Sequence, residues 1–281
     1  MSSNAVTRSH VFYIALPIIL SNLSTPLLGL VDTAVIGNLG NPALIGAIAV
    51  GGMIFSFLFW GFGFLRMGTT GLVAQALGAG NQSEARAAFY RAFIVGASIG
   101  FLLLIFQLPI IAFGLSIIDA SEQVETAALT YFQIRIWGAP LSLAHLAILG
   151  YLLGQQDTRS ILIIQLLLNI TNIILDFVFV VGLDLEVAGA AAATVLAECL
   201  ALIVGLSIVL RKMKGSSLLI PSSQLIDTMA LKRMFVVNRD IMIRTICLIF
   251  AFAWFTNEGA KSGDILLATN AILMQFVSFS A

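Results

Sequence analysis

Long apolar runs recur along the chain, and their length constrains the fold more than any other feature. A helix needs about 20 mainly apolar residues to cross the hydrocarbon core of a bilayer. Seven complete runs and an eighth that stops at the last residue cover 11–36, 43–66 (helical to about 78), 88–113, 124–151, 160–182, 187–210, 241–257 and 265–281. Only 10% of the residues are charged, against about 25% in soluble domains. The sequence therefore predicts an all-α, multi-pass membrane protein.

One long polar connection divides these runs. It covers residues 211–240 and carries the basic side chains Arg211, Lys212, Lys214, Lys232, Arg233 and Arg239. We expect a six-helix N-terminal lobe over residues 1–210, a cytoplasmic linker over 211–240, and the first two helices of a second lobe over 241–281. Residues 266–271 faintly echo residues 44–49, as in transporters built from parallel repeats. We therefore expect the sequence to hold about half of a twelve-helix protein, ending after about helix 8.

Basic residues are distributed unevenly between the two sides of the predicted helices. With the N-terminus inside, the inner side receives the six linker cations together with Arg8, Arg86, Arg91 and Arg159, which makes ten of the fourteen Lys and Arg residues. The outer side receives Lys261. This asymmetry follows the positive-inside rule. We expect a cytoplasmic N-terminus and a place in the cell membrane, meaning the inner or plasma membrane.

A polar stripe interrupts the fifth apolar run. Asn169, Asn172 and Asp176 are spaced i, i+3 and i+7, which places them on one helix face among Ile, Leu, Val and Phe. An unpaired charge in lipid costs about 2.5 to 3.5 kcal/mol even on the insertion scales. The stripe is therefore expected to face a protein interior or a water-filled cavity.

Two further polar residues are expected at the depth of this stripe. Counting at 1.5 Å per residue places Asp32 of the first helix, Asp176 of the fifth and Thr194 of the sixth in the outer half of the bilayer. With Asn172 nearby, these residues predict a proton or cation site. Oxygen-only ligands suit a hard cation such as Na⁺, whereas two close carboxylates hold a proton near neutral pH.

Other embedded polar residues have two interpretations each. Glu198, near the midplane of the sixth helix, is either a proton relay or the partner of an embedded arginine. Arg135 lies deep in its run and is expected to pair with a carboxylate. Asn169 is either functional or one of the polar residues that hold membrane helices together. Asp32 has the alternative of reaching the outer interface by snorkelling, and Thr194 that of bonding its own backbone.

Several classes of function lack support in the sequence. It has no Walker A lysine motif, which argues against an ATP-driven pump. It also lacks HExxH and GxSxG motifs, and its two histidines lie far apart, which argues against an intramembrane enzyme. The net charge is zero without a basic patch, so we expect no nucleic-acid partner. We expect no cofactor and no resident metal other than a coupling Na⁺.

Several motifs together resemble the multidrug and toxic compound extrusion (MATE) transporters, and in particular their DNA-damage-inducible protein F (DinF) branch. The motifs are ALPIILSN at 15–22, PLLGLVDTAVIG at 26–37, FLRMGTTGLVAQALGA at 64–79, IRIWGAP at 134–140, LNITNIILD at 168–176 and NRDIMIR at 238–244. The resemblance implies two six-helix lobes around a V-shaped cavity. It also implies antiport of organic compounds against H⁺ or Na⁺.

The resemblance also assigns roles to particular residues. It matches Asp32, Asn172, Asp176 and Thr194 to the cation site of the N-terminal lobe. It matches Pro17 to a proline associated with bending of helix 1.

We therefore predict a secondary antiporter that exports amphipathic organic compounds, often cationic or aromatic, in exchange for H⁺ or, as the alternative, Na⁺. The other functions left open are an organic-acid exporter or a lipid-linked precursor flippase of the same superfamily, and a non-transporting scaffold. The expected partners are small organic substrates and the lipid bilayer, and the full-length protein is expected to act as a monomer.

Overall fold

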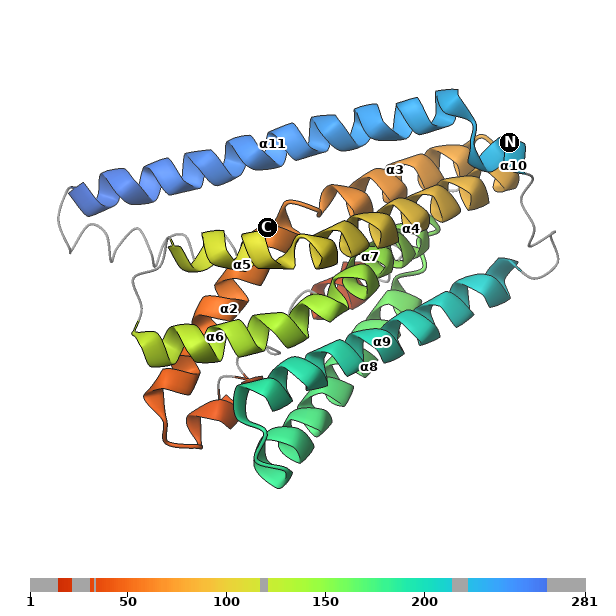
Figure 1. The fold of residues 1–281 in the computed structure, drawn as a ribbon. Helices are drawn as coiled ribbons and strands as arrows, with labels where there is room; N and C mark the ends of the chain where they lie inside the picture. Colours follow the sequence, from red (N-terminus) through yellow and green to blue (C-terminus); the bar gives the residue numbers. More distant parts are fainter. Residues whose placement is uncertain (1–14, 22–30, 33, 117–120, 214–221, 262–281) are drawn as a thin grey trace.

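The computed structural model is a bundle of long helices that run roughly side by side (Figure 1). It describes residues 15–21, 31–32, 34–116, 121–213 and 222–261. All regular secondary structure in these residues is helical, which confirms the all-α fold. The elements in chain order are α2 (Pro42–Trp60), α3 (Phe64–Gly78), α4 (Gln82–Ile105), α5 (Gln107–Ser116), α6 (Glu122–Arg135), η1 (Ile136–Gly138), α7 (Ala139–Gly154), α8 (Thr158–Asp176), η2 (Phe177–Gly182), α9 (Glu186–Met213), α10 (Ser222–Leu225) and α11 (Thr228–Lys261).

Five helical segments within the described residues are long and apolar enough to cross a membrane. They are Pro42–Gly78, Gln82–Ile105, Glu122–Gly154, Thr158–Gly182 and Glu186–Met213. Each overlaps one of the predicted spans, which confirms a multi-pass membrane protein. The predicted first span is only partly described, as helical residues 15–21 and 31–37 without residue 33, and the predicted eighth span lies outside the described residues.

Several predicted spans are interrupted where the sequence weakens the helix. The predicted run 124–151 contains the short 3-10 helix η1 directly before Pro140. Proline has no N–H and its ring crowds the preceding turn, so a continuous α-helix cannot pass this point unchanged. The predicted run 88–113 begins earlier, at Gln82, and changes direction between α4 and α5 at Phe106.

The segment expected as a polar linker is partly helical. Helix α9 continues to Met213, and α11 begins at Thr228, well before the predicted start of the seventh helix at residue 241. Asp227 begins α11 by accepting hydrogen bonds from the backbone N–H groups of Met229 and Ala230 at 2.9 and 3.2 Å. This N-terminal cap explains the early start, because it satisfies backbone donors that the first turn leaves free. The division of the chain into two lobes stays a prediction.

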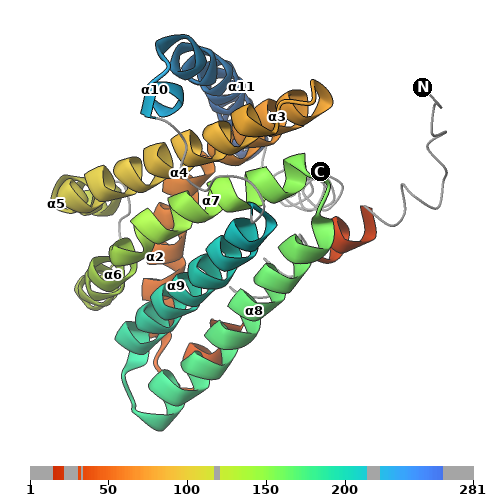
Figure 2. The same cartoon turned by 90° about the vertical axis from the view of Figure 1, so that its right-hand side faces the viewer.

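Helix α7 lies at the centre of the described bundle, against α3 and α4 on one side and α9 on the other (Figure 2). Two glycines of α4 allow the close approach. A Cβ atom on Gly96 would lie 2.6 Å from the Leu143 carbonyl oxygen, and one on Gly100 would lie 2.3 Å from Pro140 Cα. The GxxxG spacing at Gly96 and Gly100 is therefore a helix-packing motif.

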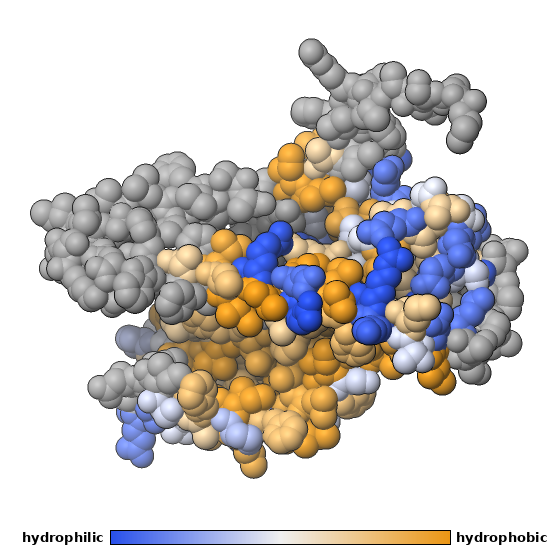
Figure 3. Space-filling view, turned by 90° about the horizontal axis from the view of Figure 1, so that it is seen from above, coloured by the Kyte–Doolittle hydropathy of each residue, from blue (hydrophilic) through white to orange (hydrophobic). Residues whose placement is uncertain are grey.

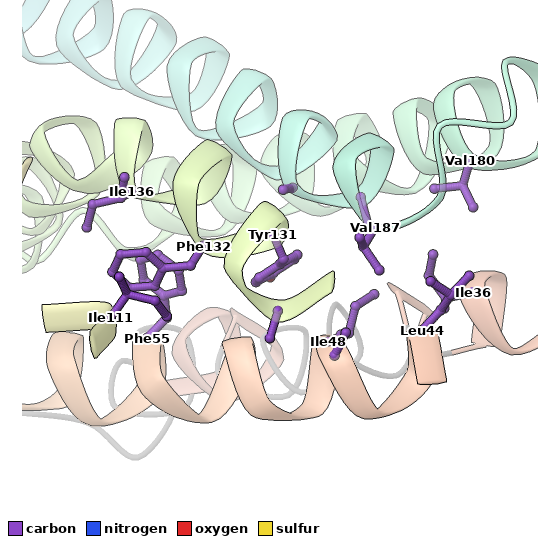
Figure 4. Packing of buried hydrophobic residues seen from close by; sticks show 14 of the residues in the cluster. Ile36, Leu44, Ile48, Phe55, Ile111, Tyr131, Phe132, Ile136, Val180 and Val187 are labelled. Atoms are coloured by element: carbon purple, nitrogen blue, oxygen red, sulfur yellow. The ribbon is translucent and has the colours of Figure 1, made fainter. Parts of the chain in front are cut away.

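An apolar cluster joins α2 and α6 to the π-helical turn η2 and the start of α9. Figure 4 shows Phe55 and Ile48 of α2 facing Tyr131 and Phe132 of α6. The rings of Phe55 and Phe132 stack with centroids 4.9 Å apart. These contacts hold α6 in place, and α6 carries Arg135 toward the polar centre of the bundle.

The outer surface is strongly apolar, as expected for contact with lipid. Ile105, Leu108 and Phe113 are 65 to 71% exposed. Seen from the side of α11, hydrophilic side chains gather beside broad hydrophobic surface (Figure 3). α11 itself packs along α3, on the outside of the bundle.

Candidate functional site

Four polar side chains predicted to form a site converge inside the bundle. Asp32 comes from the first helix, Asn172 and Asp176 from α8, and Thr194 from α9. All four are buried, and the side chains of Asn172 and Asp176 are completely so. Asp176 ends α8, directly before the chain widens into the π-helical turn η2. Such turns are frequent at functional sites, because the extra residue turns a side chain out of its regular position.

Asn172 is the centre of the hydrogen bonding. In the orientation that satisfies its neighbours, its amide nitrogen donates to Asp176 Oδ2 at 3.0 Å and to Asp32 Oδ1 at 3.2 Å. Its amide oxygen then accepts from Thr194 Oγ1 at 3.2 Å. Thr194 Oγ1 also lies 3.0 Å from the carbonyl oxygen of Ala190, so its single proton has two acceptors. One amide therefore links three chain segments.

The two carboxyl groups of the site are brought together by Asn172. Its amide nitrogen donates to both Asp32 and Asp176, and two carboxyls held so close can keep one proton between them. Among the described residues, Asp176 Oδ1 has no hydrogen-bond partner although it is buried. Chemically, the site can hold a proton between its carboxyls, and it offers only oxygen donors to a cation.

Arg135 and Glu198 form an ion pair close to this site. Arg135 Nη1 donates to Glu198 Oε2 at 3.0 Å and Nη2 donates to Oε1 at 2.5 Å, and the side chains are 10 and 12% exposed. The guanidinium lies 5.3 Å from the ring centre of Phe55 and 5.8 Å from that of Phe59. Of the two interpretations of Glu198, the structure has the arginine partner.

The remaining predicted residues are Asn169 and Pro17. Asn169 is buried one turn before Asn172 on α8. Pro17 lies in the helical segment 15–21, and the bend expected of helix 1 involves residues outside the described ones.

Sequence reasoning missed Tyr131 and Gly138. The charges of Asp32, Asp176, Arg135 and Glu198 all act on the buried Tyr131, whose position four residues before Arg135 was the available signal. Gly138 leaves room for the ion pair, since a Cβ there would lie 2.5 Å from Glu198 Oε2 and 2.6 Å from Arg135 Nη1.

A cavity of about 440 Å³ is lined in part by Glu198. Its polar lining includes Glu198, Arg66, Gln165 and His145, and Phe59 and Trp60 provide aromatic walls. His145 is buried, and neither ring nitrogen has a hydrogen-bond partner among the described residues. The cavity therefore combines apolar walls with a few polar groups, as small-molecule sites do.

Polar side chains at the opposite end of the bundle tie helices together. Arg91 is 4% exposed and donates to Glu84 Oε1 at 2.8 Å and to the Gln224 carbonyl oxygen at 2.6 Å. Lys212 Nζ lies 2.7 Å from Asp157 Oδ2 and joins the ends of α8 and α9. Partial burial raises the pKa of Asp157, but hydrogen bonds from Lys212 and Ser160 outweigh it and hold this pKa below its ordinary value.

Comparisons with known proteins agree with this architecture. The MatE family model matches residues 17–178. The DNA damage-inducible protein F of Escherichia coli (strain K12) is 42% identical over 96% of this chain and 59% of its own length. A probable multidrug resistance protein NorM of Thermotoga maritima is 28% identical over 68% of this chain and 42% of its own length.

Solved structures show the same fold. The crystal structure of a MATE protein in the bent conformation matches 96% of this chain and 61% of its own, with 21% identity and a TM-score of 0.82. An outward-facing MATE family transporter of the MOP superfamily matches 95% and 60%, with 19% identity and a TM-score of 0.82. The chain thus spans about 60% of the length of such structures, and 59% of the first curated relative.

Proposed function

The chain belongs to the MATE family of transporters, and from this premise we propose that the full-length protein is a secondary antiporter. It exports organic, amphipathic compounds in exchange for H⁺, with Na⁺ as the alternative. The names of the NorM relatives as probable multidrug resistance proteins support the substrate class. Because the chain spans 59% of its E. coli relative, the proposal applies to a protein of that full length.

The observation that carries the proposal is the pair of carboxyl groups buried in a membrane bundle. Asp32 and Asp176 are both buried, and Asn172 donates to both. A charge kept inside a membrane is costly and marks functional residues. A group that binds and releases a proton there changes the charge of the bundle. Such a change shifts a two-state equilibrium by the difference in affinity between its states.

The assignment of the Asn172 nitrogen to the side of both carboxyls favours H⁺ over Na⁺. An amide nitrogen that donates to both carboxylates occupies the space between them with hydrogen atoms. A sodium ion needs oxygen ligands, so the amide must turn its oxygen inward before Na⁺ binds. A shared proton needs no such turn.

The uneven distribution of Lys and Arg between the two sides of the helices also leads us to propose where the protein lies in the cell. We expect the plasma or inner membrane, with the N-terminus in the cytoplasm, small organic substrates and lipid as partners, and a monomer as the working unit. Single cysteines at Ser121 and Gln82, both exposed, test the orientation after Cys199 and Cys247 have been replaced. A membrane-impermeant reagent on intact cells is expected to label position 121, and labelling of position 82 alone would reverse the orientation.

The activity itself is tested with full-length protein in lipid vesicles. Export of a fluorescent organic cation is followed under an imposed pH gradient, and separately under a Na⁺ gradient at equal pH. We expect the pH gradient to drive transport, and dissipation of the gradient by an ionophore to stop it. Transport under Na⁺ alone keeps the antiporter and changes the ion. Transport under neither gradient would contradict the proposal.

A further inference from the structure

Arg135 is held from several sides at the point where α6 ends. Both terminal nitrogens donate to Glu198, and the rings of Phe55 and Phe59 flank the guanidinium. A bidentate pair of this kind is strong, and it is specific for arginine. The contacts come from α2, α6 and α9. The pair is therefore a junction between three helices.

This ion pair lies between the two polar sites of the bundle. Glu198 follows Thr194 by four residues on α9, so the two side chains share a helix face. Glu198 also lines the cavity beside Phe59. Arg135 is bonded to Glu198, and Thr194, one turn before Glu198, is linked to Asp32 through Asn172. Arg135 thus lies near two acidic groups that belong to different sites.

The charges near Arg135 change when the aspartate pair loses a proton. Arg135 neutralises Glu198, and the Asp32–Asp176 pair keeps one negative charge when it holds one proton. If that proton leaves, the pair carries two negative charges in a water-poor interior. Such charges are stable only beside a countercharge, and the arginine that acts on Asp32 is Arg135.

We propose that Arg135 is a shared counter-ion that makes proton binding at the aspartate pair and cation binding in the cavity exclude each other. When the pair loses its proton, Arg135 turns toward Asp32 and leaves Glu198 at the cavity wall without its bonded arginine. An organic cation then binds beside Glu198, Phe59 and Trp60. Return of the proton sends Arg135 back to Glu198 and expels the cation.

The structure matches the proton-loaded arrangement of this cycle in the position of Arg135. Arg135 is bound to Glu198, and Asn172 bridges the two aspartates. The inference rests on the proposed antiport and adds the role of Arg135 in it. Arg135 acts through Glu198 and Asp32, so it is a positioning residue rather than a substrate contact.

Other charged or titratable groups also face this region, and they decide how a cation enters. They are Tyr131 on α6, Asp176 on α8, and the cavity residues Arg66 on α3 and His145 on α7. Arg66 keeps its positive charge, so the cavity does not gain a second cation while Arg135 still neutralises Glu198. Entry of an organic cation therefore requires Arg135 to move. The aromatic walls then contribute cation–π attraction.

The test measures binding of tetraphenylphosphonium to the full-length protein in detergent at mildly acidic and mildly alkaline pH. Unaltered protein is expected to bind it at least about fivefold more tightly at alkaline pH, the lower range of couplings between sites. The double variant R135Q/E198Q keeps hydrogen-bonding side chains without charge. We expect its affinity to change less than about twofold between the two pH values, well below that range.

A matched control exists in the same chain. The variant R91Q/E84Q neutralises the Arg91–Glu84 pair at the far end of the bundle. It is expected to keep the full pH dependence of tetraphenylphosphonium binding. Arg135→Lys keeps the positive charge without the two-pronged geometry, and it too is expected to keep the pH dependence, whereas Arg135→Gln loses it.

Different outcomes contradict different statements. If the unaltered protein binds tetraphenylphosphonium independently of both pH and Na⁺, the proposed antiport is contradicted. If the unaltered protein is pH-dependent and folded R135Q/E198Q is equally so, only the role of Arg135 is contradicted. Should the double variant fail to fold, loss of the pH dependence in folded Arg135→Lys would equally overturn the role, because its charge is unchanged.

Discussion

Two polar clusters of this bundle differ in how completely their charges are compensated. Asp32, Asn172, Asp176 and Thr194 are buried together, and Asp176 Oδ1 has no partner among the described residues. At the other end, Arg91 is bonded to Glu84, and to the backbone of Gln224 as well.

Exposure separates the two clusters further. The Glu84 side chain is 41% exposed, so water shares its charge, whereas Asp176 is not exposed at all. Water and an arginine together stabilise the Glu84 charge, so no bound ion is required there. A buried carboxyl pair with an unpartnered oxygen is stable only when a proton or a cation is bound to it. The comparison indicates an ion site in the interior and a structural clamp at the end.

The largest effect is expected when either aspartate of the interior cluster is neutralised. Asp32→Asn and Asp176→Asn each remove one ionisable group while keeping size and hydrogen bonding. We expect transport driven by either ion gradient to fall to the background of empty vesicles, because the remaining carboxyl no longer shares a proton with a second one. Thermal stability is expected to stay equal or rise, since neutralising a buried charge removes its desolvation cost. Normal gradient-driven efflux by both variants would contradict the ion site.

The second largest effect is expected from removing Arg91 from the clamp, meaning Arg91 with its two partners Glu84 and Gln224. Arg91→Ala removes the bonds to Glu84 and to Gln224, whose carbonyl oxygen then loses its donor. We expect a loss of about 1 to 3 kcal/mol of stability, measured as earlier unfolding in detergent. Glu84→Ala is the control, because the Glu84 side chain is 41% exposed and its ion pair contributes below about 1 kcal/mol. The ion dependence of transport is expected to stay unchanged in both, and a change there would erase the distinction between the clusters.

The residues of the interior cluster were predictable because burial in a membrane leaves few choices for a polar side chain. Asp32, Asn172, Asp176 and Thr194 stand out among apolar neighbours, and helix geometry fixes both face and depth. The contact between Asp32 and Asp176 joins residues far apart in the sequence, and topology was enough to bring them to one level. The amide orientation of Asn172 was not predictable, because it depends on all three neighbours at once.

The clamp and the helix limits were harder to predict. The polar composition of residues 211–240 indicated a linker, but the cap at Asp227 begins α11 within it. The docking of Gln224 on Arg91 uses a backbone carbonyl, a group that every residue has, so no side-chain pattern identifies it. The exact partner of Arg135 was open for a similar reason, since several carboxylates lie within one lobe.

A smaller effect is expected from removing the hydroxyl group of Thr194 in the interior cluster. Thr194→Val keeps the shape of the side chain and removes the donor to Asn172. We expect the binding free energy of the coupling ion to weaken by about 1 kcal/mol, which corresponds to an affinity about fivefold lower. Thr69→Val is the matched control, because Thr69 is also buried and donates only to its own backbone at Leu65. Equal shifts in both variants, measured as the ion concentration for half-maximal transport, would assign Thr194 to packing.

The smallest expected effect concerns the ion pair of Lys212 and Asp157, at the same end of the bundle as the clamp. Lys212 is 40% exposed, so the pair contributes about 0 to 1 kcal/mol. The pKa of Asp157 is lowered in the folded protein, because hydrogen bonds from Lys212 and Ser160 outweigh the effect of partial burial. The stabilisation is therefore complete above the ordinary aspartate value and is lost as the pH falls through the lowered one.

Lys212→Met tests this pair, since it keeps the apolar stem and removes the charge. We expect the variant to unfold slightly earlier than the unaltered protein at neutral pH, and the gap to close in strongly acidic detergent buffer, where Asp157 is protonated in both. Added salt at neutral pH is expected to narrow the gap as well, because the pair is partly exposed to solvent. A gap that is equally wide at both pH values would show that Lys212 contributes through its stem rather than its charge. In that case two contacts at the same end of the bundle differ in kind: charge stabilises the clamp at Arg91, and packing of the Lys212 stem stabilises the contact with Asp157.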